Sequence, residues 1–365
     1  MSPTAPDHGK KKRRRWLRPA ALLLILVVGS VSGWTWWAED HPREERALRT
    51  LVQDQLETWL PDAMSPTSDG WYGLKHPSSG QPPTQWRILL IHGLDEPGTI
   101  WDALIPALGA KHADVWELRY PNDQGIDRST AYLAELWGQL PDDSPIILIG
   151  HSMGGLVIRD FVTGWRHPVA AAPRVAGAKV GGVILVGTPN HGSEWARLRI
   201  WLELREHLAR SEDRRFSLLA ALRDGTGAAK IDLRPESDFL RRLNARAWPE
   251  DIPIRLIGGM LVEPTQDMTA SLAAISQYTG SDALEETVSD WWGTLGDDLG
   301  DGVVRVASLE LPDAPPPTLV RASHRGMLTR LLSSDPEPPA VPVILDILGD
   351  WQSNRPSARP SSSSD

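Results

Sequence analysis

The stretch Ile146-Ile-Leu-Ile-Gly-His-Ser152-Met-Gly-Gly155 is an apolar run that leads directly into a Gly-x-Ser-x-Gly motif. The apolar run predicts a buried strand, and the glycines allow the chain to turn sharply into a helix. Such a turn lifts the Ser152 hydroxyl above the edge of a sheet. A glycine-rich turn without chemistry is the alternative, but the strand before Ser152 and the small residues after it favour a nucleophilic serine.

A serine nucleophile needs a histidine base, and that base needs a carboxylate that fixes its tautomer. When the serine lies on such a strand-to-helix turn, the acid and then the histidine follow it along the chain. His324 is the predicted base because it lies near the C-terminal end of the chain. The other histidines after Ser152 come too early to leave room for an acid-bearing strand before them; they are His167, His191 and His207.

The surroundings of His324 are typical of a loop between a strand and a helix. A short β-like run begins at Thr318, and Gly326-Met-Leu-Thr is expected to begin a helix. A surface or capping role is the ordinary interpretation of a lone histidine. The serine motif makes a base the favoured interpretation here.

The candidate acids lie together on one glycine-rich loop, Gly296-Asp-Asp-Leu-Gly-Asp-Gly-Val-Val-Arg-Val. We predict Asp301 as the acid, because it stands where the loop joins an expected valine-rich strand and can face the histidine loop. Asp298 is the alternative. Asp297 and Asp298 can equally be solvated residues, so spacing alone leaves the choice open.

Two backbone N–H groups are needed to stabilise the oxyanion that forms when a serine attacks an ester. Met153 follows the nucleophile and supplies the first. The second is expected from Leu94, because Gly93 ends an early strand, Arg87-Ile-Leu-Leu-Ile, and brings the Leu94 N–H to the site. His92 is expected to be structural, since it precedes the serine in the chain.

These segments together resemble the α/β-hydrolase superfamily, of the bacterial lipase and esterase type, close to the GPI inositol-deacylase-like lipases. The resemblance extends from Trp86 to about Asp350. It implies serine hydrolysis of an ester or lipid substrate, although the loop from Asp297 to Asp301 holds more acids than the family pattern requires. The matching segments are Leu90-Ile-His-Gly-Leu, Tyr120-Pro-Asn-Asp-Gln, Gly150-His-Ser-Met-Gly-Gly-Leu-Val-Ile-Arg, Gly187-Thr-Pro-Asn-His-Gly-Ser, Asp301-Gly-Val-Val and His324.

Strands and helices alternate through residues 86–350, which predicts one α/β domain with a mostly parallel sheet and helices on both faces. Within it, residues 191–250 are richer in helix formers and predict a helical cap or lid. Thr188, Asn190 and His191, on the loop before this region, could line a pocket. Their composition fits a plain turn better, so they are not assigned to the catalytic set.

The amino-terminal region indicates a membrane anchor. A basic segment, residues 1–18, precedes residues 19–38, which carry no charge and are about long enough to cross a bilayer as a helix. The basic residues predict a cytoplasmic N-terminus and a catalytic domain that is periplasmic or otherwise extracytoplasmic. Cleavage as a signal peptide and secretion is the alternative, because Ser30-Val-Ser32 offers small residues.

Two further segments complete the predicted organisation. Residues 39–85 are expected to form an amphipathic stalk or packing helix, from Arg43 to Leu60, followed by a linker rich in turn residues. Residues 351–365 are mostly serine and proline near the end and predict a disordered tail.

Composition excludes several classes of function. The chain has no cysteine, which rules out a disulfide, a thiolate metal site and a cysteine nucleophile, and no cofactor or metal is predicted. Residues 1–18 hold seven basic residues and one acidic residue, so the remainder has 31 basic and 46 acidic residues. An acidic surface argues against nucleic acid as a partner. The oligomeric state is not indicated.

The sequence therefore predicts a serine carboxylic-ester hydrolase, an esterase or lipase that acts through Ser152, His324 and Asp301. Acyl transfer is an alternative, since the same triad serves when an alcohol rather than water accepts the acyl group. A catalytically silent module of the same fold, binding a lipid or a membrane partner, is a third possibility. The intact and correctly ordered residues favour catalysis.

Overall fold

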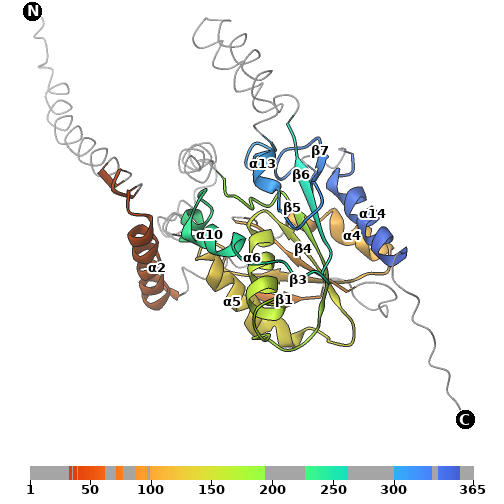
Figure 1. Cartoon of the computed structure of the whole chain (residues 1–365), viewed down its shortest axis with the longest axis horizontal. Helices are drawn as coiled ribbons and strands as arrows, with labels where there is room; N and C mark the ends of the chain where they lie inside the picture. Colours follow the sequence, from red (N-terminus) through yellow and green to blue (C-terminus); the bar gives the residue numbers. More distant parts are fainter. Residues whose placement is uncertain are drawn as a thin grey trace, which may run out of the picture.

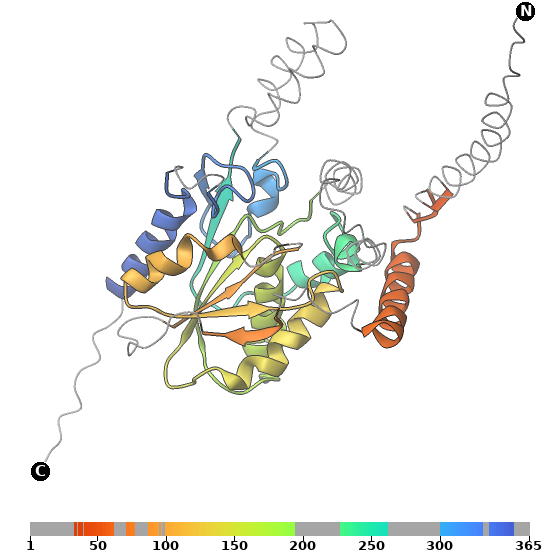
Figure 2. The same ribbon diagram turned by 180° about the vertical axis from the view of Figure 1, so that it is seen from behind.

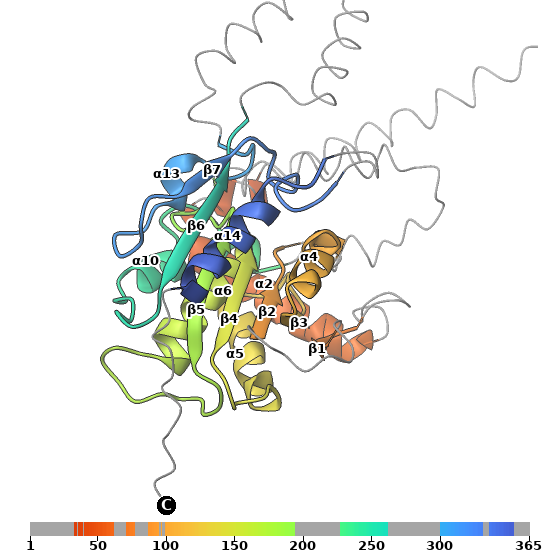
Figure 3. The ribbon, with the colours of Figure 1, turned by 90° about the vertical axis from the view of Figure 1, so that its right-hand side faces the viewer.

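The computed structural model describes residues 33–34, 36–38, 40–61, 71–76, 87–94, 96, 99–193, 227–261, 300–330 and 336–353. Its centre is a seven-stranded sheet in the order β1-β3-β2-β4-β5-β6-β7 (Figures 1 and 3). Only β1 is antiparallel to its neighbour, so the predicted, mostly parallel sheet is confirmed. The strands are β1 Gly73–Lys75, β2 Arg87–Ile91, β3 Asp114–Arg119, β4 Ile146–His151, β5 Val180–Val186, β6 Ile254–Gly259 and β7 Thr318–Val320.

Helices cover both faces of the sheet (Figures 1 and 2). Along β2, Leu89 and Ile91 pack in the cluster that contains residues of α5 and α6. Ile88 and Leu90 pack on the other face, in the cluster that contains residues of α4 and α14. A strand buried on both faces is apolar throughout, which explains why the central strands read as continuous apolar runs. The helices are α4 Leu104–Ala110, α5 Ile126–Leu136, α6 Met153–Phe161, α9 Ala229–Asp232, α10 Asp238–Asn244, α13 Val306–Leu309 and α14 Ala340–Ser353.

The carboxyl edge of the parallel strands carries the predicted functional residues. In such a sheet the loops after neighbouring strands meet at this edge. Ser152 follows β4, and Leu94 follows β2. Asp301 lies beyond the end of β6, where the Leu261 N–H donates to the Gly300 carbonyl at 2.7 Å, and His324 follows β7.

Two local predictions beside the site are wrong. The segment after Asp301 is not a strand: Val303 and Val304 lie in a turn, and α13 follows. The Asp301 carboxylate accepts the N–H groups of Val303 and Val304 at 2.9 and 2.7 Å, which occupies donors that a strand would use for pairing. Gly326 lies in a series of turns and begins no helix, and the next helix is α14.

The predicted stalk helix exists as α2, Pro42–Trp59, but it turns its polar side to the domain. Glu45 and Gln53 are each only 1% exposed, whereas Leu51 is 58% and Trp59 71% exposed. Charged contacts rather than apolar packing fix this helix, because it meets acidic and basic groups of the domain. The amphipathic pattern of α2 alone predicts that its apolar side contacts the domain, which is the opposite of what the structure shows.

Arg46 is the centre of this contact, bonding Asp232 at 2.7 Å and Asp127 at 2.8 Å. We expect Arg46→Ala to lower the free energy of unfolding by about 2 kcal/mol, because it removes the ion-pair partner of the buried Asp232 carboxylate and leaves it the Ile126 N–H as a donor. Arg43→Ala is the matched control: Arg43 is highly exposed, so loss of its pair with Asp238 should change stability much less than Arg46→Ala does. Equal denaturation midpoints for Arg46→Ala and Arg43→Ala would contradict this account of the docking.

Among the helices that the structure describes, none combines the length and apolar character needed to cross a bilayer. The predicted anchor at residues 19–38 falls mostly outside the described residues. The predicted cap at 191–250 is described only at its ends. There α9 and α10 contribute Phe239, Leu240 and other residues to the cluster over α6, and residues 194–226 of the predicted cap lie outside the described part.

Candidate active site

Ser152 occupies the turn between β4 and α6 in a strained conformation, with φ 54° and ψ −126°. Positive φ is uncommon outside glycine and costs a non-glycine residue about 1–3 kcal/mol. The turn also brings two loops close together, since a Cβ on Gly154 would lie 2.2 Å from the Ile91 carbonyl oxygen. The tight turn predicted from the Gly-x-Ser-x-Gly-Gly motif is therefore present between β4 and α6.

The strained backbone distinguishes Ser152 from an ordinary residue at the start of a helix, and the stability of two variants tests this difference. We expect Ser152→Gly to be more stable than Ser152→Ala by about 1 kcal/mol, because glycine adopts this conformation freely while alanine keeps the strain. Both variants lack the hydroxyl, so the difference isolates the backbone. Urea unfolding of the two purified variants measures it, and an alanine variant at least as stable as the glycine variant would show that the turn is relaxed.

Asp301 and His324, predicted as acid and base, are in direct contact. His324 Nδ1 lies 2.7 Å from Asp301 Oδ2, and the His324 N–H donates to the Asp301 carbonyl at 3.0 Å. Both residues are buried, with 1% of Asp301 and 9% of His324 exposed. The other Asp301 oxygen is held by the N–H groups of Val303 and Val304, so the carboxylate has one orientation. The alternative acid Asp298, with Asp297, lies outside the described residues.

Ser152 lies at the same edge of the sheet as this pair. The Ser152 N–H donates to the Val186 carbonyl at 2.9 Å. The next residue, Gly187, lies against the His324 ring, because a Cβ added there would be 3.2 Å from it. Among the hydrogen bonds of the described residues there is none between the Ser152 hydroxyl and His324. Catalytic hydrogen bonds in ligand-free enzymes are often long and tighten in the substrate complex.

The two predicted oxyanion donors lie beside Ser152. Met153 is the first residue of α6, where N–H groups have no acceptor within the helix, and Leu94 follows Gly93. A Cβ on Gly93 would lie 2.7 Å from the Ser152 Cβ, which places this loop directly against the serine. Within the described residues, neither the Leu94 nor the Met153 N–H has a protein acceptor.

His92 has the structural environment that the sequence predicts. It is 3% exposed, stacks on Tyr120 with ring centroids 4.7 Å apart, and places Nδ1 2.9 Å from the Gly93 carbonyl. Burial lowers the pKa of His92, which keeps the ring neutral. The Tyr120 hydroxyl donates to the His92 carbonyl at 2.6 Å, so the pair supports the loop that carries Leu94.

The loop after β5 is a structural junction. The Asn190 amide donates to the Leu309 carbonyl at 2.6 Å and accepts from Arg159 at 3.1 Å, and both Thr188 and Asn190 are only 1% exposed. His191 is exposed: its ring lies 3.1 Å from the Glu310 carbonyl, its backbone N–H donates to Ser308, and it also lines the pocket beside Arg159. These contacts agree with the interpretation of this segment as a turn.

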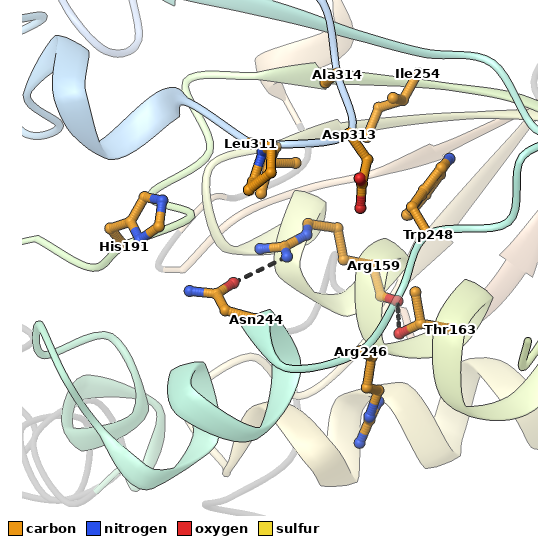
Figure 4. A pocket seen from close by; sticks show the side chains of 11 residues that line it. Arg159, Thr163, His191, Asn244, Arg246, Trp248, Ile254, Leu311, Asp313 and Ala314 are labelled. Atoms are coloured by element: carbon orange, nitrogen blue, oxygen red, sulfur yellow. Dashed lines mark hydrogen bonds between the residues drawn. The ribbon is translucent and has the colours of Figure 1, made fainter. Parts of the chain in front are cut away.

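Arg159 faces a neighbouring pocket of about 140 Å³ that shares no lining residue with the candidate centre (Figure 4). Its guanidinium donates to the amide oxygens of Asn190 and Asn244, and burial lowers its pKa to about 10. Arg159 thus ties the loop after β5 and α10 to α6. Within the described residues, no cluster of three or more His, Asp or Glu side chains could hold a metal ion.

Two buried residues at the site escape sequence reasoning, namely Glu96 and His151. Glu96 Oε1 lies 2.6 Å from His151 Nδ1, and Glu96 Oε2 accepts the Gly93 N–H at 2.6 Å. His151 is a variable position inside the serine motif, and Glu96 lies in a short turn-rich segment. Nothing local in the sequence signals that these two side chains meet.

Comparison with known proteins agrees with this fold. Residues 88–339 match the model of a family described as the alpha/beta hydrolase family. No curated protein sequence matches the chain. None of the findings identifies the GPI inositol-deacylase-like group.

Similar solved structures include the mature Bacillus licheniformis lipase BlEst2, at 17% identity and a TM-score of 0.48, covering 76% of this chain and 98% of that chain. A metagenomic carboxyl esterase, MGS0156, has 20% identity and a TM-score of 0.48 over 84% of this chain and 91% of that one. The Staphylococcus hyicus lipase has 13% identity and a TM-score of 0.46 over 75% and 97%. On the family match, which covers more than half of its length, the chain belongs to the alpha/beta hydrolase family.

Proposed function

We propose that the protein is a serine carboxylic-ester hydrolase, an esterase or lipase, in which Ser152 is the nucleophile, His324 the base and Asp301 the acid that orients it. One observation carries the proposal: a strained serine at a strand-to-helix turn shares the carboxyl edge of the sheet with a buried histidine–aspartate pair. Family membership is consistent with hydrolysis but does not by itself give the reaction.

In the proposed reaction, the Ser152 oxygen attacks the ester carbonyl carbon while His324 Nε2 takes the hydroxyl proton. The carbonyl electrons move to the oxygen, and the N–H groups of Leu94 and Met153 stabilise the resulting oxyanion. The tetrahedral intermediate then expels the alcohol, which receives the proton from His324. A water molecule, deprotonated by His324, attacks the acyl-serine and releases the acid and Ser152.

Asp301 acts through the tautomer of His324. Because Asp301 Oδ2 lies 2.7 Å from Nδ1, the neutral ring carries its proton on Nδ1 and leaves Nε2 free to accept a proton. The carboxylate also stabilises the imidazolium that forms during attack. Its two bonds from Val303 and Val304 prevent it from rotating away.

We further propose that residues 19–38 anchor the chain in a membrane, with the catalytic domain outside the cytoplasm, and that the substrate is a lipid or other apolar ester. The sequence pattern supports the anchor. Exposed aromatic residues at the C-terminal end of this segment and on α2 suit a membrane interface, since Trp36 is 72% and Trp59 71% exposed.

A panel of p-nitrophenyl esters of graded acyl length, assayed with the full chain in detergent, tests this function. We expect p-nitrophenol release with at least one chain length and free carboxylic acid as the second product. A glycerol ester formed in place of the free acid when glycerol is added would reassign the protein to acyl transfer, since the glycerol hydroxyl would then attack the acyl-serine in place of water. No turnover of any ester by the folded protein would make it a silent module.

A further inference from the structure

A continuous line of buried polar contacts joins three loops around Ser152. The Gly93 N–H donates to Glu96 Oε2 at 2.6 Å, and Glu96 Oε1 lies 2.6 Å from His151 Nδ1. On its other side, His151 Nε2 lies 3.0 Å from the backbone carbonyl of His324. The line therefore runs from the loop that carries the oxyanion donor Leu94, past the nucleophile, to the loop that carries the base.

The partners of His151 determine its protonation. A backbone carbonyl can only accept, so Nε2 must carry a hydrogen. Nδ1 faces a carboxylate, which also accepts when ionised, so the ring carries both hydrogens and is a cation beside the Glu96 anion. The contact at Nδ1 is an ion pair rather than an in-line hydrogen bond. Both side chains are buried, His151 completely and Glu96 at 4% exposure.

The electrostatics agree with this assignment. Burial is the largest single effect on Glu96 and opposes its ionisation, but the attraction of His151 and the hydrogen bond from the Gly93 N–H together outweigh it and lower the pKa of Glu96 to about 2. Burial is likewise the largest single effect on His151 and opposes its charge, but the Glu96 carboxylate, the His324 carbonyl and Asp301 together raise the pKa of His151. The groups that face the pair are His92 and Tyr120 on the Glu96 side, and Asp301 and His324 on the other.

The sign of each shift gives the pH range in which the pair stabilises the fold. The lowered pKa of Glu96 contributes stability above the ordinary glutamate pKa, and this is lost as pH falls toward 2. The raised pKa of His151 contributes stability below the ordinary histidine pKa, and this is lost only as pH rises through the raised value. The contribution is therefore complete in mildly acidic solution and persists into the neutral range.

We propose that Glu96 and His151 are positioning residues whose buried ion pair fixes the oxyanion loop and the base loop on either side of Ser152. The role in catalysis rests on the proposed function. Glu96 sets the Gly93 peptide, which directly precedes the Leu94 N–H, and His151 sets the His324 backbone. We assign neither side chain a part in forming or breaking covalent bonds.

Kinetics of three variants test this role on an ester that the wild type hydrolyses. We expect Glu96→Ala to lower kcat about 10²-fold with KM changed less than about threefold, since misplacing catalytic groups by about 1 Å has an effect of this size. Glu96→Gln should recover most of the loss, because its amide oxygen can accept the Gly93 N–H and its amide N–H₂ can donate to a neutral His151. If Glu96 had a purely structural role, Glu96→Ala would lower the stability of the fold without lowering kcat selectively over KM.

Glu117→Ala is the matched control. Glu117 is also a buried, ion-paired glutamate, bonded to Arg119 at 2.8 Å on β3, but it touches none of the three loops. The Glu117→Ala variant should be less stable than the wild type and should keep the wild-type kcat. Glu96→Ala with wild-type kcat, or Glu117→Ala with an equal loss, would overturn the proposal.

A measurement without turnover separates this proposal from the proposed function. In full-length protein labelled with ¹⁵N-histidine, the two ring nitrogens of His151, assigned from His151→Gln, should both be protonated at pH 7, in the wild type and equally in Ser152→Ala. In Glu96→Gln one of them should lose its proton. A singly protonated His151 in the wild type would refute the ion pair whether or not the protein hydrolyses esters, while an inactive protein with a doubly protonated His151 would refute only the proposed function.

Discussion

Ser152→Ala is expected to lower kcat for ester hydrolysis roughly 10⁶-fold with KM nearly unchanged, as loss of the nucleophile does in known serine hydrolases. In the proposed reaction the hydroxyl oxygen forms the bond to the acyl group, and the alanine methyl group cannot form it. Initial rates with a soluble p-nitrophenyl ester, at enzyme concentrations high enough to reveal residual turnover, measure the effect.

Ser129→Ala is the control for this prediction, because Ser129 is also a buried serine, on α5, and makes no contact with the candidate centre. It should keep wild-type kinetics. Residual activity of Ser152→Ala above about one percent of wild type would mean that another residue is the nucleophile.

Asp301→Asn is expected to lower kcat about 10⁴-fold, the loss that follows when the orienting carboxylate of a serine triad becomes an amide. The asparagine N–H₂ would face His324 Nδ1 and force the ring proton onto Nε2, the atom that must accept the serine proton. The amide oxygen can still accept from Val303 and Val304, so the fold should survive.

Paired measurements make the Asp301 prediction specific. Thermal unfolding should show a Tm close to wild type, so that loss of kcat cannot be attributed to unfolding. Asp313→Asn, an exposed acid before β7, should leave both kcat and Tm unchanged. Activity of Asp301→Asn within tenfold of wild type would shift the acid to another residue, and Asp298 is the first candidate.

The central sheet and the position of Ser152 could be predicted because they depend on local patterns. A run such as 146–149 is apolar on both sides of the strand because both faces of the sheet are covered, and glycines at 154 and 155 leave room for the turn that follows the strand. The order of serine, acid and histidine along the chain then restricted the base to His324. These features follow from backbone geometry and burial, and both leave local patterns that can be recognised in a single sequence.

Contacts between distant segments could not be predicted in the same way. The valines after Asp301 have strand propensity, but the Asp301 carboxylate takes their N–H groups and forms a turn. The apolar residues of α2 suggest a packing face, yet Arg46 and its acidic partners hold the helix by its polar side. The pair of Glu96 and His151 likewise depends on two loops meeting in space.

Labelling with a fluorophosphonate is the most direct test of the central claim, because the reagent reacts covalently with an activated serine and requires no knowledge of the substrate. Intact mass of the wild-type protein should show one adduct per chain, peptide mapping should place it on Ser152, and Ser152→Ala should remain unmodified under the same conditions. Equal labelling of the wild type and Ser152→Ala, or an adduct on a different residue, would contradict the account.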